Sequence, residues 1–193
     1  MSGIISDNLG RSSGLVKSAA VSSDYVKLGT GTVSDAASFT IDLHTTDYKY
    51  YEYRYRELYG ATNGQTVRLR FNTSAGTAQT GSGYIGAKDG SYWNSSGASN
   101  YQKAGTWSAD HLLINNNSAS ANELGYGIIR VYDPLTAGTK TCFESNTGGA
   151  EANHIYVKQC SGYYASNEAH TGISLYISSG NIYVGECNVY GVK

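Results

Sequence analysis

Two neighbouring stretches decide the fold: YKYYEYRYREL at residues 48–58 and TVRLRF at residues 66–71. Aromatic or aliphatic residues alternate with charged or polar ones through both, and a period of two places one type on each face of a β-strand. Asn63-Gly64 lies between them and can adopt the positive φ angles of a tight turn. The sequence therefore predicts an antiparallel hairpin with an apolar and a charged face. Its apolar residues are Tyr51, Tyr53, Tyr55, Val67, Leu69 and Phe71.

The same alternation continues along the chain in short runs. They lie at residues 38–43, 83–87, 111–115, 126–133, 140–144, 154–160, 172–178 and 181–192. Ser179-Gly180-Asn181 is predicted to join the last two as a second hairpin. About eight to ten strands separated by Gly and Asn predict an all-β fold, an antiparallel two-sheet sandwich of jelly-roll type, with a barrel as the alternative.

Length and composition agree with one β-domain. The chain has 193 residues, 40% of them hydrophobic, which suffices for a core. The 18 tyrosines and 24 glycines, with one proline, favour short strands and turns. A net charge of −1 and a charged fraction of 15% give no basic surface for nucleic acid.

No targeting or spanning segment is evident. The first residues lack the basic start and apolar run of a signal peptide, and no later run approaches the length of a membrane span. We therefore expect a protein that stays in the compartment where it is made, without membrane insertion. Cys142, Cys160 and Cys187 have neither paired spacing nor neighbouring ligands, which predicts buried reduced thiols, with a single disulfide between any two of them as the alternative.

Residues 1–24 are predicted to be an extended arm ahead of a body at residues 25–193. Burial of its five aliphatic side chains would contribute about 8–15 kcal/mol. Ordering the backbone of residues 1–18 costs roughly 1–2 kcal/mol per residue, so the arm should not order by itself. It is predicted to attach to a partner, with a free tail as the alternative. The five are Ile4, Ile5, Leu9, Leu15 and Val16.

The arm GIISDNLGRSSGLVKS resembles the amino-terminal signature of small proteins encoded by marine tailed bacteriophages, G-I-I-S-D-N-x-G-R-S-S-G followed by an all-β body. The closing GNIYVGECNVYGVK is similar to those proteins too, and both motifs cover about 30 residues. The resemblance implies a virion structural protein, assembled in the host cytoplasm and exposed as a fibre, tail appendage or capsid decoration. It implies a virion attachment segment made of Gly3, Ile4, Ile5, Ser6, Asp7, Asn8, Gly10, Arg11, Ser12, Ser13 and Gly14.

Residues 86–107 do not alternate and hold both tryptophans among Gly, Ser and Asn, which predicts a long loop. Aromatic rings there could stack on sugars while amides bind hydroxyl groups, so the loop is a candidate site for a host-surface glycan. Burial of the rings as structural anchors is the alternative. The candidate residues are Tyr92, Trp93, Asn94, Tyr101 and Trp107.

The charged residues of the opening hairpin form a second candidate surface. A solvated sheet face with cross-strand ion pairs explains them, and a subunit interface in a homo-oligomer, such as a trimer, is the functional alternative. These residues are Glu52, Arg54, Arg56, Arg68 and Arg70.

Catalysis has little support in the sequence. Polysaccharide hydrolysis needs two facing carboxylates, and the neighbouring pairs are Asp42 with Asp47 and Glu144 with Glu151. Histidines 44, 111, 154 and 170 lack the spacing of metal ligands and are interpreted as solvated loop positions. We expect a non-enzymatic virion protein without cofactor or metal, bound to other virion proteins through its arm. A carbohydrate-binding module is the alternative.

Overall fold

A computed structural model describes residues 24–60, 65–73, 76–94, 97–103, 112–117, 125–151 and 154–193. Every regular element in these ranges is a strand. The strands are β1 (Tyr25–Ala36), β2 (Ser38–Ile41), β3 (Tyr50–Gly60), β4 (Gln65–Asn72), β5 (Tyr84–Asn94), β6 (Gly97–Lys103), β7 (Leu112–Asn117), β8 (Gly125–Tyr132), β9 (Cys142–Glu151), β10 (His154–Tyr164), β11 (Gly172–Ile177) and β12 (Ile182–Val192). Among them is no helix that could span a membrane.

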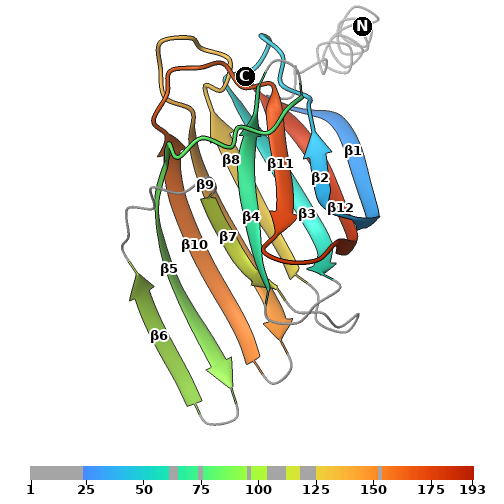
Figure 1. Cartoon of the computed structure of the whole chain (residues 1–193), viewed down its shortest axis with the longest axis vertical. Coiled ribbons are helices and arrows are strands. Elements are labelled where there is room, and N and C mark those ends of the chain that lie inside the picture. The colour runs from blue at the N-terminus through green and yellow to red at the C-terminus, as the bar shows by residue number, and fades with distance from the viewer. Residues whose placement is uncertain are drawn as a thin grey trace, which may run out of the picture.

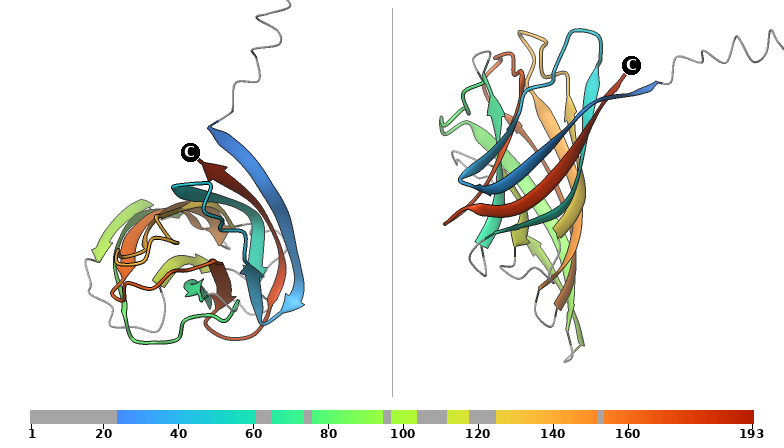
Figure 2. Two further views of the ribbon diagram at one scale, coloured as in Figure 1. Left: turned by 90° about the horizontal axis from the view of Figure 1, so that it is seen from above. Right: turned by 90° about the vertical axis from the view of Figure 1, so that its right-hand side faces the viewer.

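The strands form two antiparallel sheets. The larger has the order β1-β12-β3-β8-β9-β10-β5-β6 and the smaller the order β2-β11-β4-β7. Figure 1 shows the smaller sheet in front of the larger one, and Figure 2 shows the larger sheet curving around it. The prediction of an all-β two-sheet sandwich of jelly-roll type is confirmed. The arm at residues 1–23 lies outside the described residues.

Both predicted hairpins are wrong. β3 pairs with β12 and β8, whereas β4 pairs with β11 and β7 in the other sheet. The segment 178–181 likewise connects β11 in the smaller sheet to β12 in the larger one. The physical reason is that alternation fixes only which face of a strand is apolar. Two strands facing each other across a core satisfy that pattern as well as two strands paired in one sheet.

The core confirms which faces are apolar. Tyr51 and Tyr53 of β3 and Leu69 and Phe71 of β4 are 0% exposed, and they belong to one cluster between the sheets. Tyr84 of β5 ties the sheets together: its hydroxyl accepts from the Phe71 N–H and donates to the Gln79 carbonyl, each at 2.9 Å. Buried tyrosines thus supply both apolar surface and satisfied polar groups.

The segment predicted as a long loop is largely regular. Its residues form β5 and β6, which pair from Lys88↔Lys103 to Asn94↔Gly97. The period-two alternation of β5 and β6 is not visible in the sequence, because small residues occupy positions at which a larger side chain would clash. A Cβ on Gly90, for example, would lie 2.9 Å from the Lys158 side chain and 3.0 Å from the Val157 carbonyl oxygen.

The cysteines depart from the prediction at one position. Cys160 and Cys187 are buried, but Cys142 is exposed at the start of β9. Burial raises the pKa of the Cys187 thiol to about 12, followed in size by the effect of Glu186. Cys187 is therefore protonated and unreactive at neutral pH.

Candidate functional site

The outer face of the larger sheet carries most of the organised polar chemistry. At its centre Glu52 of β3 is 1% exposed. Its carboxylate accepts hydrogen bonds from Arg54 Nε at 2.6 Å, Arg130 Nε at 2.8 Å and the Tyr25 hydroxyl at 2.9 Å. Arg130 also donates to Glu144 at 2.7 Å. The cluster joins β1, β3, β8 and β9 across the sheet.

The protonation of Glu52 follows from these contacts. Burial opposes its ionisation, but the hydrogen bonds from Arg130, Arg54 and Tyr25 outweigh burial and hold the pKa of the carboxyl below its usual value. Hydrogen bonds from Arg130 and Tyr132 lower the pKa of Glu144 as well. Both carboxylates are therefore ionised at neutral pH and are neutralised by arginine.

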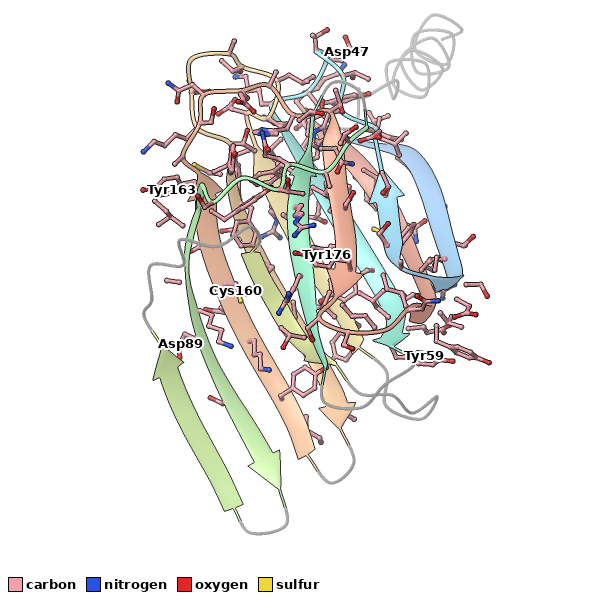
Figure 3. All side chains as sticks on the ribbon, in the orientation of Figure 1. Asp47, Tyr59, Asp89, Cys160, Tyr163 and Tyr176 are labelled. Carbon is pink, nitrogen blue, oxygen red and sulfur yellow. The ribbon has the colours of Figure 1, made fainter. Side chains whose placement is uncertain are left out.

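The five charged residues predicted as one surface are divided between two faces. Glu52, Arg54 and Arg56 lie on β3 of the larger sheet, whereas Arg68 and Arg70 lie on β4 of the smaller one. The Arg70 guanidinium lies 4.4 Å from the centre of the ring of Tyr176 on β11, a residue labelled in Figure 3. Because the two sheets pack through their apolar faces, the charged faces point in opposite directions.

A shallow trough lies on the outer face beside the Glu52 cluster. Its main part, about 470 Å³, crosses β9, β10 and β5. An adjoining part of about 240 Å³ shares Asp89 and Gln159 with it and continues toward Val157 and Ser91. Figure 3 labels Asp89 and Cys160 on two of these strands. The lining side chains of the main part include Ala87, Asp89, Glu144, Asn146, Gln159 and Ser161.

Large apolar side chains are exposed next to this trough. Tyr126 of β8 is 58% exposed, and Ile155 and Val157 of β10 are 65% and 57% exposed. Tyr126 and Val157 are both in register with Gly148 of β9. The sequence alone does not reveal this surface, because its residues come from strands far apart in the chain. Each of them, taken alone, resembles any other side chain on the exposed face of a strand.

The predicted glycan-binding residues are placed by backbone register. Tyr92 pairs with Tyr156 and Trp93 with Ile155 on β10, while Tyr101 of β6 pairs with Gly90. Neighbouring positions of a strand belong to opposite faces of a sheet, so Tyr92 and Trp93 do not share a face. Asn94 ends β5, and Trp107 lies outside the described residues.

Three of the four carboxylates considered for hydrolysis lie in the part of the chain whose side chains are described. Asp42 accepts from the Asn72 side chain at 2.7 Å beside the smaller sheet, and Asp47 is exposed in the loop before β3. Glu144 lies on the outer face of the larger sheet, bound to Arg130. The Glu151 side chain lies outside the described part, within which no group of His, Cys, Asp and Glu could hold a metal ion.

Two histidines predicted to be solvated are buried. His44 is 9% and His170 0% exposed. His44 Nδ1 donates to the His170 carbonyl at 2.8 Å, which leaves Nε2 to accept from the Tyr53 hydroxyl. Burial lowers the pKa of His44 to about 4 and that of His170 to about 4. His111 and the His154 side chain lie outside the described residues.

Comparisons with known proteins add no family. No family model and no curated protein matches the sequence. Among solved structures, the chain is similar to the marine PL-14 alginate lyase from Aplysia kurodai, with 10% identity, a TM-score of 0.33, and coverage of 88% of this chain and 81% of that one. It is also similar to the CBM2 module of Lactobacillus casei BL23 phage J-1 evolved Dit, with 7% identity, a TM-score of 0.21 and coverage of 84% and 68%. Similarity at this level carries no argument about function.

Proposed function

We propose that this protein is a bacteriophage virion structural protein whose arm attaches it to other virion proteins and whose β-sandwich is displayed outward as a fibre, tail appendage or capsid decoration. The proposal draws on the arm signature and on one feature of the body. β1 begins at an edge of the larger sheet, where Tyr25 is in register with Val192 and the Lys193 N–H donates to the Asp24 carbonyl at 3.1 Å. The arm therefore joins the body at one end.

The opposite end of the sandwich is free of this junction. Figure 1 shows the end of β5 and the beginning of β6 at the end of the molecule remote from the start of β1. A body attached to a particle at the start of β1 would present this remote end of the sandwich away from the particle. The proposal locates the protein on the virion and includes a homo-oligomer, such as a trimer, whose mass would be measured by sedimentation.

Deletion of residues 1–18 should abolish incorporation into particles and leave the body folded. The body retains its complete core because the described strands begin at Tyr25. Mass spectrometry of purified particles from cells that express full-length or truncated protein measures incorporation, and circular dichroism measures folding. A matched full-length variant, Ile4→Asp with Ile5→Asp, should lose incorporation as the deletion does. Equal incorporation of truncated and full-length protein would refute anchoring by the arm.

Binding of a host-surface glycan is the second candidate function. It is favoured by the position of Trp93 as the second-last residue of β5, a strand that ends far from the start of β1 in Figure 1. Replacement of Trp93 with Ala should weaken binding to host-surface polysaccharide by roughly 1–3 kcal/mol, as loss of a central aromatic contact does. Calorimetry measures the affinity and a thermal melt the stability. Unfolding of the variant, or absence of binding by the native protein, would assign Trp93 to structure.

A further inference from the structure

We infer that the trough on the outer face of β9, β10 and β5, together with the Tyr126 ring beside it, is a binding site for an uncharged polysaccharide chain. The site shares its ligand class with the second proposed function but rests on residues outside the β5–β6 turn. Neither its location nor its residues follow from the arm or from virion attachment.

The apolar side of the site is the ring of Tyr126, which packs over a glycine of the neighbouring strand. A Cβ on Gly148 of β9 would lie 2.9 Å from both Cζ and Oη of Tyr126, so the Tyr126 ring lies across the β9 backbone at this position. The ring is 58% exposed and Val157, in the same row of the sheet, is 57% exposed. A flat, solvent-exposed aromatic ring beside an aliphatic side chain suits the C–H face of a pyranose ring.

The polar side of the site offers unused hydrogen-bonding groups. Asn146 of β9 and Gln159 of β10 are directly in register and both are exposed. Neither side-chain amide has a hydrogen-bond partner among the described residues, although each can donate two hydrogen bonds and accept two. Asp89 of β5, in register with Gln159, accepts a hydrogen bond from the Gly90 N–H at 2.7 Å. Amides and a carboxylate in one row match the donors and acceptors of sugar hydroxyls.

The charge of the lining selects against anionic polymers. Glu144 is neutralised by Arg130 at 2.7 Å, while Asp89 makes no ion pair within the described part of the chain. Lys88 also borders the trough, but it is in register with buried Cys160, so its side chain belongs to the opposite face of the sheet. The outward side chains of the lining therefore carry a small negative charge, and a polyuronate would be repelled at this face. A neutral glycan meets no such opposition.

The dimensions fit a chain better than a single sugar. The two parts of the trough, about 470 and 240 Å³, adjoin at Asp89 and Gln159, which line both. From Ser161 to Val157 the trough follows β10 for four residues, which is about 13 Å at the rise of a strand. This length accommodates roughly two or three pyranose units.

The experiment measures binding of purified full-length protein to soluble dextran, mannan, xylan and mixed-linkage β-glucan by affinity electrophoresis and calorimetry, with alginate as the polyanion. At least one neutral polymer should bind and alginate should not. Tyr126→Ala should weaken that binding at least about tenfold, and Gln159→Ala several-fold, without lowering the melting temperature. The matched control is Tyr183→Ala, which removes a tyrosine with similar exposure, 51%, on β12, and should bind as the native protein does.

Three results would overturn the inference. The first is no binding to any neutral polymer. The second is undiminished binding by both Tyr126→Ala and Gln159→Ala, because loss of affinity in Trp93→Ala alone would then assign the glycan to the β5–β6 turn. The third is a concentration-dependent dimer that Tyr126→Ala dissociates, which would make this face an interface between copies. None of these depends on incorporation into particles, so failure of the virion proposal remains a separate outcome.

Discussion

Lowering the pH from 7 to 4 will reduce the free energy of unfolding by about 3 kcal/mol for each of His44 and His170. Burial lowers the pKa of both imidazoles from 6.5 to about 4 in the folded chain. Between these values the unfolded chain binds a proton that the folded chain does not, so stability falls as the pH falls. The loss begins near pH 6.5 and is complete below about pH 4.

The hydrogen bonds explain why the folded chain resists protonation. His170 Nδ1 lies 2.7 Å from the Thr141 hydroxyl, and its Nε2 is buried without a partner among the described residues. In the charged imidazolium both ring nitrogens carry a proton, so the buried Nε2–H would be unpaired and the charge would lie against the Phe71 ring, whose centre is 5.1 Å from that of His170. For His44, protonation of Nε2 would require the buried Tyr53 hydroxyl to stop donating.

Urea unfolding at intervals between pH 7 and 4 measures the effect, with His170→Gln as the diagnostic variant. Its free energy of unfolding should fall by about 3 kcal/mol less than that of the native chain over this range. Glu52, Glu144 and Glu186 have lowered pKa values, and their contribution is lost only as the pH falls below about 4.5. Most of the histidine effect thus precedes theirs. Identical pH profiles for variant and native chain would contradict the burial of an uncharged His170.

The alternation of apolar and polar residues correctly predicted which side chains of β3 and β4 face the core. Tyr51, Tyr53 and Leu69 are buried as expected, because a two-residue period assigns each side chain to a face whatever the strand pairs with. The partner of each strand could not be predicted in this way. β3 pairs with β12, more than a hundred residues later in the chain, and β4, the next strand after β3, belongs to the other sheet although the residue types of Asn63-Gly64 favour a hairpin.

The candidate sites were harder to predict than the fold because they are assembled across strands. Glu52 is one charged residue in an alternating run, and its burial depends on Arg130 from β8 and Tyr25 from β1. The exposed ring of Tyr126 is explained by Gly148 on the neighbouring strand. A single sequence shows neither the register of the strands nor these neighbours. Trp93, by contrast, can be picked out from the sequence because tryptophan is rare in the chain.

The burial of His44 and His170 had no sequence signal. Both lie in connecting segments, which usually run over the surface. Their burial follows from the backbone bond between the His44 N–H and the Thr171 carbonyl at 2.9 Å and from that between the His170 N–H and the Pro134 carbonyl at 2.7 Å. These bonds hold together three connecting segments, those after β2, after β8 and before β11.

Substitution of Glu52 with Gln should lower the free energy of unfolding by about 2–3 kcal/mol at pH 7. The change keeps the shape of the side chain but removes the charge that the two arginines share, and removal of a buried partner leaves its counter-ions uncompensated. The expected loss lies below that of a fully buried pair because Arg130 and Arg54 remain 29% and 49% exposed to water.

Glu186→Gln is the matched control for Glu52→Gln, since it alters a carboxylate of the same sheet face that also binds an arginine. Glu186 accepts from Arg56 at 2.8 Å, but its side chain is 27% and that of Arg56 63% exposed. An exposed pair of this kind contributes little, so its variant should unfold at nearly the native urea concentration.

Because Glu52 has a lowered pKa in the folded chain, the difference between Glu52→Gln and native protein should shrink as the pH falls through that pKa, where protonated Glu52 also lacks its charge. Equal stability of the two variants at pH 7 would show that the Glu52 cluster does not hold β1, β3 and β8 together. A change in oligomeric mass caused by Glu186→Gln would instead indicate that this charged face is a subunit interface.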